Sequence, residues 1–177
     1  MKLALGLDFG TESGRALLVD VATGTEVASA VHRYADGVID ERLPSSDVKL
    51  APEWALQNPD DWIAVLRDAV PNAMRAANAS PDDVIGIGVD FTACTILPTL
   101  ADGTPLCTID KWKRNPHAWP KLWKHHAAQP EAERITSLAS ERVEEWLAEV
   151  GGRVSSEWMH SKVLEIINDA PDVYDAS

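Results

Sequence analysis

The N-terminal stretch constrains the fold most, because short apolar runs alternate there with tight turns. Leu3–Leu7 is an apolar run suited to a buried strand, and a second run, Arg15–Asp20, follows the turn-rich segment Asp8–Gly14. After the turn Ala22–Thr25, the residues Glu26–His32 alternate at the period of a strand. Strands joined by such short turns pair as an antiparallel meander. A Rossmann unit would place a helix after the first strand, so the sequence excludes it.

A helix is predicted to begin at Asn58, after the polar and proline-punctuated stretch 36–57, which we expect to be irregular. Asn58 can cap the helix, Pro59 suits its first position, and two carboxylates follow near the positive end of the helix dipole. Apolar residues then recur at helical spacing on one predicted face: Trp62, Val65, Leu66, Ala69, Val70 and Ala73. Pro71 lies inside this pattern, and the sequence leaves open whether it kinks the helix or splits it.

Two further strands are predicted at Val84–Asp90 and Thr95–Leu100. From Pro116 onward the pattern becomes helical, with segments near Trp119–His126, Glu131–Leu138 and Val143–Val150. Ser155 and Ser156 can cap a last helix, on which Met159, Val163, Ile166 and Ile167 share a face. These elements predict an α/β fold with a mixed sheet and flanking helices. No closing strand follows, so we expect the sheet to be incomplete and the chain to be part of a longer protein.

Charge and composition bound the possible partners. The net charge is −12 and the sequence pI is about 4.7, and such a surface repels phosphate backbones, which argues against nucleic acid as a partner. No stretch approaches the ~18 consecutive apolar residues of a membrane-spanning helix, so no membrane partner is expected. The two cysteines, Cys94 and Cys107, are expected to be reduced thiols in a cytoplasmic protein.

The segment Asp8–Arg15 holds the parts that phosphoryl transfer requires. Asp8 follows a buried strand and is a hard oxygen ligand for Mg²⁺, while Gly10 lets a bulky anion approach the backbone. Thr11 and Ser13 add hydroxyl groups, and Arg15 adds a cation. The segment is unlike a Walker loop, because no Gly-Lys-Ser/Thr sequence follows. Taken alone, it is equally compatible with a plain hairpin turn.

A second candidate segment runs from Gly86 to Thr95. Its apolar strand ends in Thr92, Ala93 and Cys94, which would form a floor for a small polar ligand beyond the end of the strand. The alternative is structural: the glycines would pack under a helix and Cys94 would be a small buried apolar group.

Tryptophans supply a third candidate feature. The chain has seven, and indoles suit sugar recognition because the ring face packs on C–H groups while the N–H serves a hydroxyl. Trp119, Trp123 and Trp158 lie in candidate segments, next to His125–His126 and Glu157. For any single tryptophan, packing in a core is the alternative.

Read together, these segments resemble the FGGY carbohydrate kinases, which share the actin-like, ribonuclease H-like ATPase fold. Asp8–Ser13 resembles the N-terminal phosphate-binding hairpin of that family, and Gly86–Thr95 resembles the sugar-contacting segment of its ribulokinase branch. Leu122–His126 and Ser155–Trp158 are also similar to that branch. The resemblance runs from Leu3 to about Ile167 in matching order.

The resemblance implies ATP and Mg²⁺ as cofactors. By position, Asp8 would help to hold Mg²⁺. The ATP phosphates would be met by Gly10, Thr11, Glu12, Ser13 and Arg15.

The resemblance also implies a sugar site. Thr92 and Ala93 stand where glycerol-type relatives carry an Arg-Glu pair, and these small residues, followed by Cys94, would leave room for a pentulose. Trp123 and Glu157 match positions that line the sugar pocket.

The implied reaction transfers the ATP γ-phosphoryl group to a terminal hydroxyl of a ketopentose, L-ribulose being favoured. The alternatives are a kinase for another polyol or ketose, such as xylulose or ribitol, and a non-catalytic sugar-sensing member of the fold. Residues 1–177 would be the N-terminal part of the first kinase domain, with the general-base Asp and the adenosine site downstream. We therefore expect the isolated chain to be inactive, and a homo-oligomer is possible for the full-length form.

Overall fold

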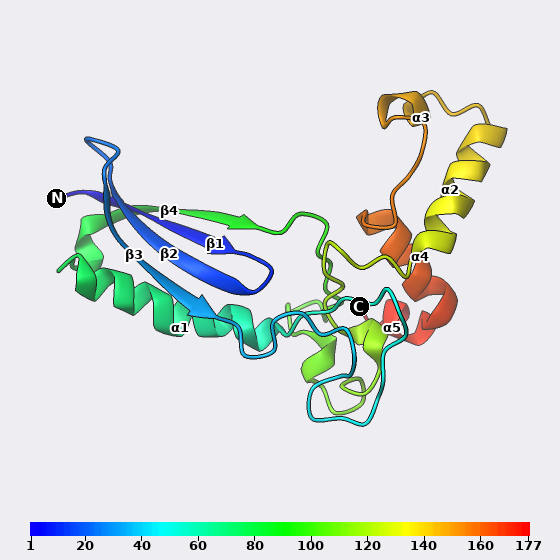
Figure 1. Cartoon of the computed structure of the whole chain (residues 1–177), viewed down its shortest axis with the longest axis horizontal. Coiled ribbons are helices and arrows are strands. Elements are labelled where there is room, and N and C mark those ends of the chain that lie inside the picture. Colours follow the sequence, from blue (N-terminus) through cyan, green and yellow to red (C-terminus); the bar gives the residue numbers. More distant parts are fainter. The chain divides into compact units, whose positions relative to one another are not determined.

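A computed structural model describes every residue from Met1 to Ser177 (Figure 1). The chain divides into two units, one formed by residues 1–37 and 58–92, the other by residues 38–57 and 93–177. None of the helices combines the length and apolar character needed to cross a membrane.

The first unit is built on a four-stranded mixed sheet. Its strands are β1 (Leu3–Phe9), β2 (Ser13–Asp20), β3 (Glu26–Arg33) and β4 (Val84–Phe91), in the order β3-β2-β1-β4. β1 and β2 are antiparallel, as are β2 and β3, whereas β4 runs parallel to β1. The predicted meander and the predicted mixed sheet are therefore confirmed.

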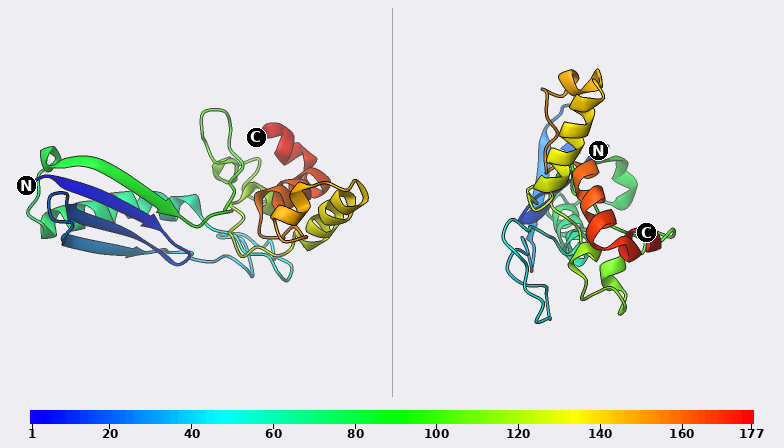
Figure 2. Two further views of the ribbon diagram at one scale, coloured as in Figure 1. Left: turned by 90° about the horizontal axis from the view of Figure 1, so that it is seen from above. Right: turned by 90° about the vertical axis from the view of Figure 1, so that its right-hand side faces the viewer.

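A single helix, α1 (Pro59–Ala76), connects the meander to β4 and covers β2 and β3 on one face of the sheet (Figure 2). Its start is the predicted one, because the Asn58 side chain accepts a hydrogen bond from the backbone N–H of Asp60. Pro71 lies inside the helix, which continues on both sides of it, so the helix is not split. The short 3₁₀ helix η1 (Pro81–Asp83) then leads into β4.

The core of the first unit lies between α1 and the meander. The buried residues of this core are Leu3, Leu5, Leu7, Ala16, Leu18, Tyr34, Val65, Ala69 and Ala73. Leu66 was predicted on the buried face but is exposed. In β4, Ile85, Ile87, Val89 and Phe91 are 58–65% exposed, so their side of this edge strand has no cover within the described residues.

The second unit is mostly irregular chain with short helices. They are η2 (Leu106–Thr108), η3 (Pro116–Ala118), α2 (Gln129–Glu141), α3 (Trp146–Glu149), α4 (Met159–Asp169) and α5 (Pro171–Ala176). One apolar cluster joins Leu106, Trp112 and Ala118 to the last two helices. A second joins Cys107 and Trp119 to the 38–57 stretch, through its residues Ile39, Leu43 and Leu56. As predicted, that stretch forms no regular element.

Two elements predicted for the second unit are wrong. Thr95–Leu100 is not a strand, and Trp119–His126 is not a helix. Instead, Ile96 and Lys121 exchange both backbone hydrogen bonds, at 3.1 and 2.9 Å, in an isolated antiparallel bridge. Pro98 and Pro120 lack the N–H that a longer ladder or a helix interior needs, so each pattern is interrupted.

The last predicted helix exists, but its start and its buried face differ from the prediction. Helix α4 begins at Met159, after Trp158, and no side chain caps it. Met159 and Ile167 are exposed, and the buried residues are Ser161, Lys162, Glu165 and Ile166. The helix therefore buries a lysine and a glutamate, which apolar spacing alone does not predict.

Candidate functional site

The predicted phosphate-binding turn is a tight hairpin loop between β1 and β2. The backbone N–H of Gly10 donates to the carbonyl of Ser13 at 3.0 Å, which closes the loop. The carbonyl of Glu12 accepts from the backbone N–H of Tyr34 at 3.1 Å, so the loop is also anchored to the end of the meander. Because its amide closes the turn, Gly10 would contribute to a phosphate site through its missing side chain rather than through its N–H.

Strand register places opposite charges side by side next to this loop. Asp8 on β1 is the pairing partner of Arg15 on β2, and on its other side it pairs with Asp90 on β4. Leu3, Leu5 and Leu7 point to the core, so alternation along β1 places Asp8 on the opposite face of the sheet from α1. Asp8, Arg15 and Asp90 are all exposed. No role for Asp90 follows from the sequence alone, although both carboxylates lie at the ends of apolar strands.

The carboxylates fit a Mg²⁺ ion that keeps several waters. Neighbouring strands lie ~4.8 Å apart, so the register partners Asp8 and Asp90 on the parallel strands β1 and β4 could share an ion or its waters. The described residues contain no group of three or more histidine, cysteine or acidic side chains arranged to hold a metal. Waters and phosphate oxygens would therefore have to complete the coordination of Mg²⁺, which is the usual arrangement for this ion with nucleotides.

Tyr34 adds an unpaired polar group to this unit. Its hydroxyl is buried without a hydrogen-bond partner. Burial first, and then the negative charges of Asp61 and Asp8, raise the pKa of Tyr34 to about 12. The phenol is therefore neutral at physiological pH and keeps its proton. Asp61 is itself held by the backbone N–H groups of Ala35 and Asp36, at 2.8 and 3.2 Å.

The predicted sugar segment begins where β4 ends. Thr92 still belongs to the first unit, and its N–H donates to the carbonyl of Phe9 at 3.2 Å. Ala93 and Cys94 belong to the second unit, and both are exposed. The alternative of Cys94 as a buried packing group is therefore wrong. Cys94 has a φ of 64°, a left-handed conformation that is sparsely populated outside glycine and recurs at functional sites.

The second unit brings Trp123 next to this segment. The N–H of Trp123 donates to Oγ1 of Thr95 at 3.2 Å, one residue beyond Cys94. The Ile96–Lys121 bridge continues the same pairing, so the chain around Cys94 and the chain around Trp123 run side by side. The Trp123 side chain is 37% exposed and thus accessible to a ligand, whereas Trp119 is buried and donates its indole N–H to the carbonyl of Lys113.

Glu157 is half-buried in the loop before α4. Its carboxylate lies 3.7 Å from Nε2 of His126, whose Nδ1 lies 3.1 Å from Oγ of Ser156. Glu157 and His126 are therefore linked, and the histidine is three residues beyond Trp123. Sequence analysis named His126 but did not predict this contact, which joins segments 30 residues apart.

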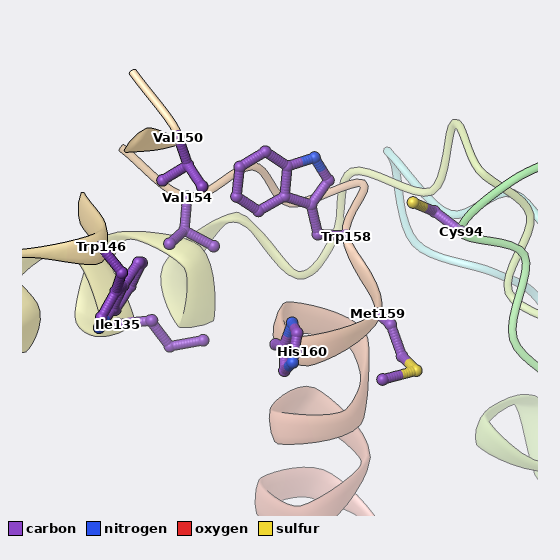
Figure 3. Close-up of a pocket in the computed structure, with 8 residues that line it drawn as sticks. All are labelled: Cys94, Ile135, Trp146, Val150, Val154, Trp158, Met159 and His160. Atoms are coloured by element: carbon purple, nitrogen blue, oxygen red, sulfur yellow. The ribbon is translucent and has the colours of Figure 1, made fainter. Parts of the chain in front are cut away.

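The second unit also contains an apolar cavity of about 690 Å³ (Figure 3). Its lining residues are Cys94, Ile135, Trp146, Val150, Val154, Trp158, Met159 and His160. Of the residues predicted to contact sugar, Cys94 lines it, whereas Trp123 and Glu157 do not. A sugar needs several hydrogen-bonding partners, and this lining offers few, so the cavity does not fit a sugar by itself.

In comparisons with known proteins, the chain is similar to kinases whose names refer to sugars or polyols. It is 54% identical over 174 residues to a ribulokinase of Geobacillus thermodenitrificans, a match that covers 98% of this chain and 31% of that protein. A ribulokinase of Mycolicibacterium smegmatis is 52% identical over 176 residues, again with 31% of that protein covered. The chain thus spans about a third of the length of these curated relatives. No family model matches it.

Solved structures confirm the fold class. A xylulose kinase from Rhodospirillum rubrum superposes with a TM-score of 0.74 at 21% identity, covering 99% of this chain and 31% of the other. A Plasmodium falciparum glycerol kinase with ADP superposes with a TM-score of 0.64 at 14% identity, covering 99% of this chain and 30% of the other. At such identities the likeness establishes the fold alone. The chain is thus homologous by sequence to the N-terminal part of ribulokinases, and it has the fold of the FGGY carbohydrate kinases.

Proposed function

We propose that the full-length protein transfers the γ-phosphoryl group of ATP to a terminal hydroxyl of L-ribulose. The observation that carries this proposal is the identity of more than 50% with ribulokinases over nearly the whole of this chain. The geometry supports it, because the exposed Asp8 and Arg15 flank a tight turn, and because the backbone N–H of the partly exposed Trp123 bonds to Thr95, next to Ala93 and Cys94 in sequence.

On this proposal, the hairpin binds the triphosphate. When bound, Mg²⁺ neutralises charge on the phosphate oxygens, and Asp8 would hold the ion through its carboxylate. Arg15, directly opposite on β2, would offset the remaining negative charge. Gly10, Thr11, Glu12 and Ser13 would form the loop that meets the phosphates, with the hydroxyl groups of Thr11 and Ser13 as donors.

The sugar would be bound by Thr92, Ala93, Cys94, Trp123 and Glu157. The exposed face of Trp123 would pack on sugar C–H groups, and the carboxylate of Glu157 would accept from a hydroxyl. Ala93 would leave space for the carbon chain of a pentulose. We place this reaction in the cytoplasm, where ATP is available and an exposed thiol such as Cys94 stays reduced.

The test is a coupled assay of ADP release by the full-length protein with ATP, Mg²⁺ and a panel of L-ribulose, D-xylulose, ribitol and glycerol. We expect L-ribulose to give the highest kcat/KM. A higher value for another member would replace the substrate while keeping the reaction class. No turnover with any member would favour a non-catalytic, sugar-sensing protein.

The same assay tests the place of Ala93. Ala93→Glu fills the proposed space with a charged side chain, so it should raise KM for L-ribulose by ~10-fold or more and leave KM for ATP within about twofold. Ala93→Ser, which adds a single oxygen, is the matched control and should change both constants little. Equal effects of Ala93→Glu on both substrates would remove Ala93 from the sugar site.

A further inference from the structure

Lys162 on α4 is a fully buried lysine that no site described above uses. Its side chain is 0% exposed. The ammonium group donates to three backbone carbonyls: that of Leu122 at 2.7 Å, that of Cys94 at 2.8 Å and that of Trp123 at 3.3 Å. These partners come from two chain segments that lie 68 and about 40 residues before it in sequence.

The chemistry of the group suits this position. An ammonium carries three N–H donors and no acceptor, so three converging carbonyls satisfy it completely. Burial, and secondarily the charge of Lys121, lower the pKa of Lys162 to about 8, while Cys94, Glu157 and Glu165 act in the opposite direction. Most of the group is therefore protonated at neutral pH and keeps all three donors.

The three carbonyls belong to the two segments that carry the proposed sugar contacts. The pairing of these segments is short, consisting of the Ile96–Lys121 bridge and the bond from the Trp123 N–H to Thr95. Beyond it the chain turns at Cys94, in its left-handed conformation. Lys162 binds the carbonyls at this end of the pairing.

Glu165, one turn further along α4, holds the same chain through side chains. Its carboxylate forms an ion pair with Lys121 at 3.1 Å and lies 3.0 Å from Nε2 of His125. Because Nδ1 of His125 accepts the N–H of Ala55 at 3.2 Å, the proton of the neutral ring is on Nε2, which donates to Glu165. The indole of Trp54 packs over the Lys121 ammonium, 4.0 Å from it.

We propose that Lys162 is a positioning residue for the sugar site, holding the backbone of Cys94 and of Trp123 in one arrangement so that their side chains meet the same ligand. This inference rests on the proposed function. Burying a charge costs desolvation free energy that an apolar side chain of similar size would not cost. Three charge-assisted hydrogen bonds to the main chain, however, fix the position of two loops. Glu165 binds side chains of the same segment, those of Lys121 and His125, rather than the backbone of Cys94 or Trp123.

The test uses Lys162→Met in the full-length protein, with Ile166→Ala as the matched control. Met keeps much of the hydrocarbon stem and removes the three donors. Ile166 is also buried on α4, but it packs in the apolar cluster with Leu106 and Trp112, which contains none of the three carbonyl residues. We expect Lys162→Met to raise KM for L-ribulose by ~10-fold or more, with KM for ATP within about twofold. Ile166→Ala should destabilise the protein but should not raise KM for L-ribulose more than KM for ATP.

Hydrogen–deuterium exchange supplies a readout that is independent of activity. In Lys162→Met the backbone amides of residues 94–95 and 122–124 should exchange faster than in the wild type, and the increase should be clearly larger than in Ile166→Ala. Ile96 is left out of this readout because it packs against the cluster that contains Ile166. Unchanged exchange in these segments, or an equal rise of both KM values, would overturn the proposal. If the wild type lacks ribulose kinase activity but the exchange result holds, the proposed function fails and the structural tie remains.

If Lys162→Met does not fold, Lys162→Arg serves instead. Arg keeps the charge but cannot place its planar guanidinium on the same three carbonyls. Lys162→Arg should therefore also raise KM for L-ribulose more than KM for ATP, by a smaller factor than Lys162→Met. KM values for sugar equal to those of the wild type in this variant would count against the proposal.

Discussion

His117 illustrates how burial sets the chemistry of a single residue. Its Nδ1 is buried without a hydrogen-bond partner, and its ring packs edge-on against Trp54 at a centroid distance of 4.9 Å. Burial, with the charge of Lys121 as a smaller cause, lowers the pKa of His117 from 6.5 to about 4. The folded protein therefore keeps a neutral imidazole at pH values where the unfolded chain carries an imidazolium.

This shift predicts a pH dependence of stability. Between pH 6.5 and about 4 the unfolded state binds a proton at His117 that the folded state does not, so the free energy of unfolding should fall as the pH falls through this window. His117→Phe removes the titration and should flatten that part of the curve. Urea denaturation of both proteins at a series of pH values measures it. Parallel curves for the two proteins would show that His117 does not contribute.

At the scale of elements, the meander and α1 fit together through a glycine. Gly14 on β2 faces Val65 of α1, and a Cβ at this position would overlap Cγ2 of Val65 and lie 2.8 Å from Cγ1. Val65 is fully buried in the core between the helix and the sheet. The sequence marks Gly14 as a turn residue, whereas the structure gives it a packing role inside a strand.

Gly14→Ala should therefore destabilise the protein by about 1–3 kcal/mol, since α1 would have to shift away from β2. Gly86→Ala is the matched control, because a Cβ at Gly86 meets no atom within 4 Å among the described residues. Urea denaturation of the wild type and both variants measures this, and the midpoint should fall for Gly14→Ala but not for Gly86→Ala. A loss for Gly86→Ala as large as that for Gly14→Ala would mean that the contact with Val65 is not responsible.

At the scale of the whole molecule, the described residues carry groups for binding but none that we assign as the general base. On the proposed function, Asp8, Arg15 and the hairpin loop would bind the nucleotide, and Cys94, Trp123 and Glu157 would bind the sugar. Asp90 pairs with Asp8 in the sheet, and its Oδ1 accepts the N–H of Phe91 at 2.9 Å. On the proposed function, the base lies in the part of the relatives' length that this chain does not span.

The purified 177-residue chain should therefore show no sugar-dependent ATP consumption, while the full-length protein should. The coupled assay with L-ribulose, ATP and Mg²⁺ compares the two at equal molar concentration. Circular dichroism of the shorter protein is the control that it is folded. Turnover by a folded 177-residue chain would contradict the assignment and make Asp90 the first candidate for the base, to be tested by Asp90→Asn.

The sequence by itself determined the elements whose signals are local. The hairpins of β1–β3 follow from alternation and turn residues, and the start of α1 follows from Asn58 and Pro59. Each depends on residues a few positions apart, so the printed sequence contains the whole signal. The three strands and the start of α1 were therefore predicted close to their observed bounds.

Tertiary structure alone decided the second unit and the buried face of α4. Whether Thr95–Leu100 forms a strand depends on the chain around Lys121, about 25 residues away, with which Ile96 forms an isolated bridge rather than a ladder. Likewise, apolar spacing places Met159 inside, yet Lys162 and Glu165 are buried instead. Burying a charge costs far more than exposing a methionine, unless partners from distant segments satisfy it. Those partners are the carbonyls of Cys94, Leu122 and Trp123 for the lysine and the side chains of Lys121 and His125 for the glutamate, and only the folded chain brings them together.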